Sequence, residues 1–286
     1  MKNIVIMPNI ERDPDLVYTK KTISALAGKS VFVSEEFASD LRGLATPLPQ
    51  EKLFDNMDLA IALGGDGTLL SVAHHAAPLS LPILGINLGH LGFLAEIEKQ
   101  EIEKSLLKLC ADEYTIENRI MLRGTITRES GETLTLDALN DIVVSRNEGS
   151  RLIVLNLFVG GEYVDEYKAD GLLVATPTGS TAYSMSAGGP ILDPAVKSFV
   201  ITPICPHKLY AKTIVAPDDV EIMLTISNNH ADPRSAIVSA DGRENIILKE
   251  GDVLTLRRSA YTAQLVKING SRFYSVLQHK LLGKDK

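Results

Sequence analysis

The chain has 286 residues, of which 45% are hydrophobic and 23% are charged. This composition is typical of a folded globular protein and argues against intrinsic disorder, collagen-like repeats and coiled coils. At about 150 residues per domain, the length predicts two domains. The 29 lysines and arginines against 36 aspartates and glutamates give a net charge of −7, which argues against nucleic-acid binding through a broad basic face.

The sequence predicts neither a membrane anchor nor an export signal. Its N-terminal apolar stretch ends at Pro8-Asn9 without a cleavage site of small residues, and no apolar run approaches the ~18 residues that span a bilayer. The two cysteines, Cys110 and Cys205, form no Cys-x-x-Cys motif, so neither a disulfide framework nor a zinc site is expected. We therefore expect a cytoplasmic protein that binds no nucleic acid and no membrane.

The first 112 residues predict an α/β domain with a parallel sheet. Short runs rich in β-branched residues alternate there with helix-like segments, which is the pattern of βαβ units. The expected helices cover residues 13–27 and 100–111, and Gly28 follows the end of the first. The expected strands cover residues 3–7, 29–33, 59–63 and 83–86.

From Tyr114 onward, the pattern changes to that of a β-rich domain. Short runs of Val, Ile, Leu and Thr are separated by turn residues at spacings of about ten, which predicts an antiparallel sandwich or layered sheet. The expected strands cover residues 123–127, 142–145, 152–159, 172–176, 220–226, 236–239 and 253–257. We place the domains at 1–112 and 113–286, with a boundary near 112–118 and a last segment that can pack back on the first domain.

A glycine-rich loop follows the apolar run 59–63. It reads Gly64-Gly65-Asp66-Gly67-Thr68 and leads into a segment that can form a helix. Glycines allow positive φ and close approach of an anion, while a helix N-terminus attracts negative charge. The loop matches neither the P-loop nor the Gly-x-Gly-x-x-Gly fingerprint.

Asp66 is unexpected in a phosphate-binding loop, because its carboxylate repels phosphate. It can hold Mg²⁺ or accept a proton from an attacking hydroxyl. The alternative is that Asp66 only caps the following helix.

Further loops carry polar and small residues suited to a ligand. The block Thr176–Pro190 has Met185 as its only large aliphatic side chain, and Tyr183 offers an aromatic face. The loop 87–94 is punctuated by glycines, and Asn140-Asp141 precedes an expected strand. Because ligands bind at the carboxyl ends of parallel strands, loops 64–68 and 87–93 are expected to share a crevice.

These motifs together resemble the NAD kinases, which phosphorylate NAD to NADP. The blocks that match appear in the family's order and cover most of the chain. They are Gly64-Gly65-Asp66-Gly67-Thr68, Asn87-x-Gly89-x-Leu91-Gly92-Phe93-Leu94, Asn140-Asp141, Asp170-Gly171 and 176–190. The first block alone is weak, since lipid kinases and phosphofructokinases have a similar loop, whereas the block 176–190 is highly specific.

The resemblance implies an α/β N-terminal domain, a β-rich C-terminal domain, an active site in the cleft between them and a homo-oligomer, either a dimer or a tetramer. It implies that Asp66 is the general base for the 2′-hydroxyl of the adenosine ribose. The donor would be ATP or polyphosphate, and the cofactor a divalent metal ion such as Mg²⁺, with no residue assigned as a metal ligand. The implied substrate-binding residues are Gly65, Gly67, Thr68, Asn87, Phe93, Asn140, Asp141, Arg151, Lys168, Asp170, Thr181, Ala182, Tyr183, Ser184, Ser186 and Arg243.

Three departures from the commonest family pattern concern substrate preference, such as NAD against NADH. Asp141 replaces a frequent Glu, Lys212-Thr213 replaces Arg-Pro, and Arg243 replaces Gln. Two alternative functions remain open: a lipid or sugar kinase with the same glycine-aspartate loop, and a non-catalytic dinucleotide sensor. The block 176–190 disfavours the first alternative, and the presence of Asp66 argues against the second.

Overall fold

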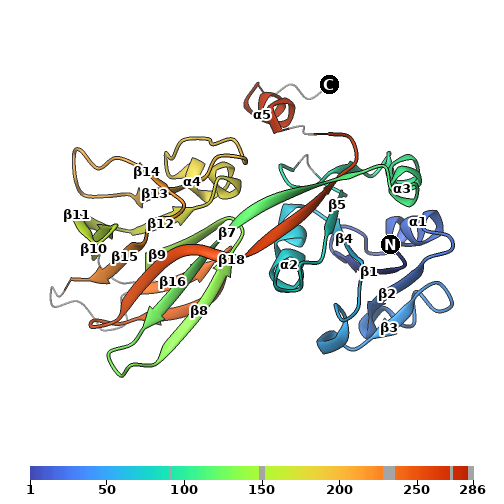
Figure 1. Cartoon of the computed structure of the whole chain (residues 1–286), viewed down its shortest axis with the longest axis horizontal. Coiled ribbons are helices and arrows are strands. Elements are labelled where there is room, and N and C mark those ends of the chain that lie inside the picture. The colour runs from blue at the N-terminus through green and yellow to red at the C-terminus, as the bar shows by residue number, and fades with distance from the viewer. Residues whose placement is uncertain (90–91, 148–151, 228–235, 271–272, 283–286) are drawn as a thin grey trace. The chain divides into compact units, whose positions relative to one another are not determined.

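The computed structural model describes residues 1–89, 92–147, 152–227, 236–270 and 273–282 (Figure 1). The chain forms two compact units. Unit 1 comprises Met1–Asn118 and Tyr261–Lys286, and unit 2 comprises Arg119–Ala260. The α/β first region and the strand-rich second region that the sequence predicts are thereby confirmed.

Unit 1 is built on a parallel sheet whose strands run in the order β6-β5-β4-β1-β2-β3. Strand β4 is buried along its whole length, as expected for a continuous apolar run in a parallel sheet. The four expected strands are confirmed to within a residue at each end. The bounds are β1 Asn3–Pro8, β2 Ser30–Ser34, β3 Thr46–Leu48, β4 Leu59–Gly64, β5 Ile83–Asn87 and β6 Ile97–Glu98.

Helices cover both faces of this sheet. Helices α1 (Val17–Ala25) and α3 (Ile102–Cys110) contact each other and share a core with alternate strand residues such as Leu84 and Ile86 (Figure 1). Gly85 lies between those two and faces Leu69 of helix α2 (Asp66–Ala76). Helix α2 therefore lies on the opposite face, because successive strand residues point to opposite sides.

Helix α1 is shorter than the expected helix 13–27. The Asp13 carboxylate accepts hydrogen bonds from the backbone N–H groups of Tyr18 and Thr19, at 3.1 and 2.8 Å. Leu16 immediately before the helix has a left-handed φ of 53°. Residues 13–16 therefore form a turn that presents Asp13 to the helix N-terminus, where a carboxylate is stabilising.

The remaining short elements of unit 1 were not expected from the sequence. They are the 3₁₀ turns η1 (Glu35–Phe37), η2 (Gln50–Lys52) and η3 (Ala77–Leu79), and the C-terminal helix α5 (Phe273–Leu282). None of the described helices is long and apolar enough to cross a membrane.

Unit 2 is antiparallel throughout its two sets of paired strands. One set runs in the order β14-β13-β12-β9-β16-β17. The other contains β11-β10-β15-β18, and β7 pairs with both β18 and β8. The bounds are β7 Thr115–Thr127, β8 Thr133–Ala138, β9 Asp141–Arg146, β10 Ile153–Val159, β11 Glu162–Ala169, β12 Gly171–Ala175, β13 Ser198–Ile204, β14 Ile214–Pro217, β15 Ile222–Ile226, β16 Ala236–Ala240, β17 Arg243–Leu248 and β18 Val253–Lys267.

The seven expected strands of unit 2 are present, but strands β7 and β18 are longer than the expected 123–127 and 253–257. Both continue through polar stretches, because pairing with neighbouring strands satisfies their backbone groups. Several strands were missed, namely β8, β11, β13, β14 and β17. Strand β11 is mostly exposed and β13 is wholly buried, so neither shows the alternation by which half-buried strands are recognised.

Candidate active site

The glycine-rich loop lies where β4 passes into helix α2, and its glycines are needed for space rather than for positive φ. None of Gly64, Gly65 and Gly67 has a positive φ, which corrects the expectation from sequence. A Cβ on Gly64 would come within 2.2 Å of the Thr68 hydroxyl oxygen. That hydroxyl accepts a hydrogen bond from Asn9 Nδ2 at 3.1 Å, so Thr68 is fixed by packing in the loop.

The space beside Gly65 and Gly67 is open. A Cβ built on either residue meets no atom of the described residues within 4 Å. Both glycines stand at the N-terminus of α2, where backbone N–H groups lack helical partners and attract an anion. The loop therefore has room for a phosphate to approach its backbone.

Asp66 does not cap its own helix. The N-cap is Gly65, and Asp66 occupies the first helical position. Its carboxylate instead accepts two backbone hydrogen bonds from another loop, from Phe93 N to Oδ2 at 2.8 Å and from Leu94 N to Oδ1 at 3.1 Å. The capping alternative is therefore wrong, and Asp66 joins loops 64–68 and 87–94 within unit 1.

Gly92 permits this contact, a role that the sequence analysis did not assign to it. A Cβ at Gly92 would lie 2.1 Å from Asp66 Oδ1. The repeated glycines of the loop were the available sequence signal, but only the structure shows that the Asp66 carboxylate packs against Gly92. Phe93 also contacts α5, with its ring 6.1 Å from the ring of Phe273 and 4.5 Å from Lys280 Nζ.

Asn87 is buried at the end of β5, with 1% of its surface exposed. Its side-chain amide donates to both carboxylate oxygens of Glu98, at 3.1 and 3.2 Å, and its Oδ1 accepts from Gly89 N at 3.1 Å. These contacts shape the start of loop 87–94. His90 and Leu91 of the same loop lie outside the described residues.

In unit 2, Asn140 and Asp141 stand at the start of β9 and are held by two other segments. The Asp241 carboxylate accepts hydrogen bonds from the N–H groups of Asn140 and Asp141, at 2.8 and 3.2 Å. Thr176 N donates to Asn140 O at 2.8 Å. The Oδ1 atom of Asn140 is buried and has no hydrogen-bond partner within the described part of the chain.

The carboxyl groups in this region ionise less readily than usual. Burial, and to a lesser degree the charge of Asp241, raises the pKa of Asp141 to about 7. Burial also raises the pKa of Asp241, although three backbone N–H groups and Arg243 oppose this shift. Because those donors favour ionised Asp241, we assign the remaining proton of the pair to Asp141.

The block 176–190 folds into the 3₁₀ turn η4 (Thr178–Thr181) and the single-turn helix α4 (Tyr183–Ser186). Some of its hydroxyls serve the protein itself. Ser180 Oγ donates to Pro177 O at 2.6 Å, and Ser184 is fully buried beside Thr202. Tyr183 is 45% exposed, and burial is the main cause that raises its phenol pKa.

The other predicted binding residues of unit 2 are more dispersed. Thr181 and Ala182 are half-buried, Ser186 is exposed beside Tyr183, and Lys168 is exposed on β11. Asp170 accepts a hydrogen bond from Arg146 Nε at 2.6 Å. Arg243 begins β17, next to the Asp241-Gly242 turn, and Arg151 lies outside the described residues.

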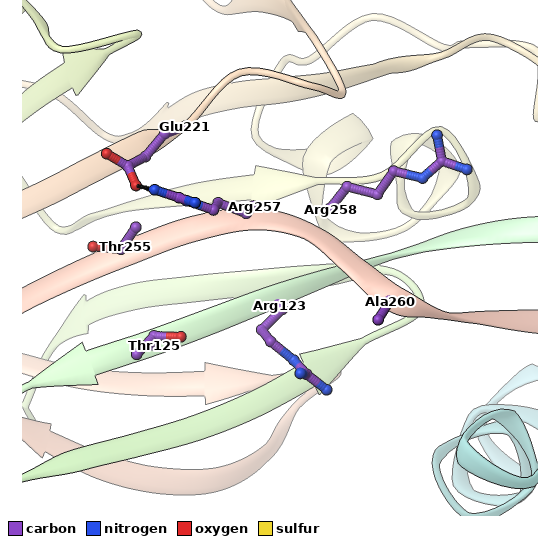
Figure 2. A pocket seen from close by; sticks show the side chains of 7 residues that line it. All are labelled: Arg123, Thr125, Glu221, Thr255, Arg257, Arg258 and Ala260. Atoms are coloured by element: carbon purple, nitrogen blue, oxygen red, sulfur yellow. Dashed lines mark hydrogen bonds and ion pairs between the residues drawn. The ribbon is translucent and has the colours of Figure 1, made fainter.

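A pocket of about 470 Å³ in unit 2 involves none of these residues (Figure 2). Its three arginines point in different directions, and each is paired with a carboxylate: Arg123 with Asp137, Arg257 with Glu221 and Arg258 with Asp218. Because the charges are already neutralised, this pocket does not resemble a convergent anion site. It is lined by Arg123, Thr125, Glu221, Thr255, Arg257, Arg258 and Ala260.

Comparison with known families agrees with the geometry. The family model for the ATP-NAD kinase N-terminal domain matches residues 45–114, and that for the ATP-NAD kinase C-terminal domain matches residues 139–268. The NAD kinase of Caldanaerobacter subterraneus subsp. tengcongensis is 42% identical over 284 residues, which cover 98% of this chain and 99% of the relative. The NAD kinase of Carboxydothermus hydrogenoformans is 44% identical over 79% of this chain and 80% of the relative.

Solved structures of the same kind are also similar. The yeast NADH kinase complexed with NADH matches with a TM-score of 0.91 at 25% identity, covering 100% of this chain and 89% of the yeast chain. An NAD kinase from Archaeoglobus fulgidus in complex with ATP matches with a TM-score of 0.74 at 26% identity, covering 99% of both chains. The chain therefore belongs to the NAD kinase family, and its activity is the phosphorylation of NAD.

Proposed function

We propose that the chain transfers a phosphoryl group from ATP to the 2′-hydroxyl of the adenosine ribose of NAD, with Asp66 as the general base. The observation that carries this proposal is the placement of Asp66 at the start of α2. Its carboxylate is fixed there by hydrogen bonds from the backbone N–H groups of Phe93 and Leu94. Each carboxylate oxygen has a second lone pair. Asp66 can therefore accept the proton of an attacking hydroxyl while its backbone contacts are kept.

The glycine-rich loop supplies the phosphate-binding part of the proposed mechanism. Phosphoryl transfer depends on positioning and on stabilisation of charge at the transferring group. Gly65 and Gly67 leave open space beside the N-terminus of α2, where backbone N–H groups can bind the phosphates. Thr68 is held in the same loop by Asn9.

We propose Mg²⁺ as the cofactor, carried mainly by the phosphates of the donor. No group of three or more His, Cys, Asp or Glu side chains suited to a metal occurs among the residues that the structure describes. Mg²⁺ commonly keeps several waters and binds substrate phosphates together with only one or two carboxylates, so a nucleotide donor can carry it without a dedicated protein site. When bound, the ion would offset the negative charge of the transferring group.

Unit 2 is proposed to hold the dinucleotide. Asn140 Oδ1 is a buried hydrogen-bond acceptor that has no donor among the described residues, and burying such an atom is costly unless a ligand satisfies it. The exposed ring of Tyr183 offers a stacking surface. Asp141, Lys168, Asp170, Thr181, Ala182, Ser184, Ser186, Arg151 and Arg243 complete the proposed set in unit 2, and Asn87 and Phe93 of unit 1 are proposed as further substrate-binding residues.

The test of the proposed function is NADP formation by the purified protein with NAD, ATP and Mg²⁺. We expect NADP to accumulate with ATP and to be absent when the donor is omitted. Polyphosphate and NADH, offered separately, establish the donor and the redox preference. Binding of NAD without turnover with either donor would favour a dinucleotide sensor, and phosphorylation of diacylglycerol or fructose 6-phosphate alone would favour a lipid or sugar kinase.

Gly67→Ala is expected to weaken ATP binding without destabilising the fold. The added methyl group meets no atom within 4 Å in the part of the chain that the structure describes, and alanine is the better helix former by up to about 1 kcal/mol. The same methyl group would occupy the space proposed for a phosphate. We expect the KM for ATP to rise about tenfold, with an unchanged or higher melting temperature.

Ser71→Ala is the matched control for this variant. Ser71 is exposed on the same helix, beyond its first turn. The substitution therefore changes helix propensity without altering the glycine-rich loop. Kinetics in ATP and thermal melts are measured for both variants. An unchanged KM for ATP in Gly67→Ala would contradict the phosphate-binding role of the loop.

We also propose that the enzyme is a homo-oligomer in the cytoplasm. Leu209 and Tyr210 are 94% and 83% exposed between β13 and β14, and large apolar side chains exposed together mark interaction surfaces. The cytoplasmic proposal agrees with the free thiols of Cys110 and Cys205. We expect light scattering to give a multiple of the 31.0 kDa chain mass and a smaller species for Leu209→Asp/Tyr210→Asp; a monomeric wild type would contradict this.

A further inference from the structure

The turn formed by Leu139, Asn140 and Asp141 has all of its backbone polar groups bonded to two residues. Asp241 accepts from the N–H groups of all three residues, at 2.8, 2.8 and 3.2 Å, and Asp241 N donates to Asp141 O at 3.0 Å. Thr176 Oγ1 donates to Leu139 O at 2.5 Å, and Thr176 N donates to Asn140 O at 2.8 Å. The backbone of the turn therefore cannot rotate without losing several hydrogen bonds.

The side chains of the turn are bound differently from its backbone. Asn140 Oδ1 is buried without a partner among the described residues, and Asp141 is buried with 5% of its surface exposed. A backbone held this completely, beside a side-chain acceptor that lacks a donor, is the arrangement expected of a preorganised ligand site.

Asp241 does more than a hairpin turn requires. Asp241 and Gly242 connect β16 to β17 with φ values of 50° and 70°, as in a type I′ turn, which Asn-Gly forms as readily as Asp-Gly. An asparagine would thus keep the turn, but its amide cannot accept at both ends. One end would present N–H groups to the backbone N–H groups of residues 139–141.

We propose that Asp241 is a positioning residue for NAD: its carboxylate fixes the backbone of Asn140 and Asp141. This inference rests on the proposed function of Asn140 and Asp141 as dinucleotide-binding residues. Asp241 itself contacts the turn and is not assigned a contact with substrate.

The charge of Asp241 affects the ionisation of Asp141 and therefore predicts a pH dependence of NAD affinity. Burial and, to a lesser degree, Asp241 raise the pKa of Asp141 to about 7. Among the described residues, Arg243 interacts with Asp241, and Tyr183 interacts with Asp141, Cys205 and Asp170. Ala175 of β12 is the strand partner of Asp141. Ionised Asp141 accepts hydrogen bonds from ribose hydroxyls more strongly than the neutral acid, so NAD affinity should increase as the pH rises through about 7.

Asp241→Asn changes both the hydrogen bonds that hold the turn and the negative charge beside Asp141. Thr176→Val changes only the hydrogen bonds. Without the neighbouring negative charge the pKa of Asp141 falls, so the pH at which NAD affinity increases moves to lower values in Asp241→Asn. Thr176→Val loses the Oγ1 bond to Leu139 but leaves the charge of Asp241 in place. Its NAD affinity is expected to fall, with the pH transition unmoved.

The experiment measures the Kd of NAD by calorimetry between pH 5.5 and 8.5, together with kcat and KM. We expect the Kd to rise about tenfold in each variant at pH 8, with kcat at saturating NAD changed less than the KM. Asp218→Asn is the matched control, because it removes another carboxylate from unit 2, one that pairs with Arg258. Its NAD affinity is expected to stay at the wild-type value.

The outcomes separate this inference from the proposed function. A wild type that neither binds nor phosphorylates NAD contradicts the proposed function. If the wild type binds NAD and folded Asp241→Asn has the same Kd and the same pH transition, the positioning role of Asp241 is overturned. If Asp241→Asn does not fold, Thr176→Val decides the positioning, since an unchanged Kd there contradicts it.

Discussion

Asp66→Asn is expected to lower kcat at least about a hundredfold, because a positioned general base contributes roughly 10²–10⁴-fold to a proton transfer. The amide has nearly the size and shape of the carboxylate but cannot accept a proton at neutral pH. Turnover of NAD to NADP, measured at saturating NAD and ATP, checks the prediction. Normal turnover by the folded variant would remove Asp66 from the role of base.

The hydrogen bonds of Asp66 make a second measurement necessary. Its two oxygens accept from Phe93 N and Leu94 N, so the amide of asparagine would place N–H groups against one of these donors. Loss of activity can therefore come from a displaced loop 92–94 as well as from a missing base. Separate measurement of kcat and KM distinguishes the two causes.

If Asp66 is the base, the loss in Asp66→Asn appears mainly in kcat, because the missing proton acceptor affects the transition state. If Asp66 only anchors the loop, the change appears mainly in KM. Gly92→Ala provides the comparison, because a Cβ there would come within 2.1 Å of Asp66 Oδ1. It disturbs the same contact while the carboxylate is kept.

The backbone of unit 1 was largely predictable because its determinants are local. The apolar run of β4 has the length and composition of a buried parallel strand, and its glycine-rich continuation predicted a loop before helix α2. The signal was weaker for helix α1, where Asp13 binds the N–H groups of Tyr18 and Thr19 across a turn. A helix boundary set by such a side-chain contact is hard to place from periodicity alone.

The contacts that position the candidate site were not predictable, because they join residues far apart in the chain. The sequence left a helix cap open as the alternative for Asp66, while the structure gives its carboxylate hydrogen-bond partners at Phe93 N and Leu94 N. No role was predicted for Asp241 from the sequence, yet its carboxylate accepts hydrogen bonds from the N–H groups of residues 139–141. Resemblance to a family identified which residues to consider, and the geometry showed how two of the aspartates are used.

In the block 176–190, too, some features were predictable from the sequence and others only from the structure. Its small residues predicted close approach, and Gly179 confirms one such approach, though to the protein backbone: a Cβ there would lie 2.1 Å from Asn140 O. Its hydroxyls were expected to face a ligand, whereas Ser180 Oγ donates to Pro177 O and Ser184 is buried against Thr202. Composition alone cannot distinguish a hydroxyl that binds substrate from one that satisfies its own loop.

Gly179→Ala is expected to destabilise the protein by about 3 kcal/mol, the upper part of the usual range for overpacking. The methyl group would come within 2.1 Å of Asn140 O and 2.5 Å of its carbonyl carbon. These are backbone atoms held by Thr176 N and by the Asp241 carboxylate, so they cannot move aside as a flexible side chain can. Chemical denaturation measures the loss.

Gly67→Ala is the comparison for stability, because its added Cβ has no described residue within 4 Å and should leave the unfolding free energy unchanged or higher. The displaced Asn140 should also weaken NAD binding in Gly179→Ala, measured by calorimetry below the melting temperature. Equal stability of the two alanine variants would show that loop 176–190 can move away from the Asn140 turn. The rigid backbone inferred for that turn would then be wrong, and with it the reason for placing Asn140 in a preorganised site.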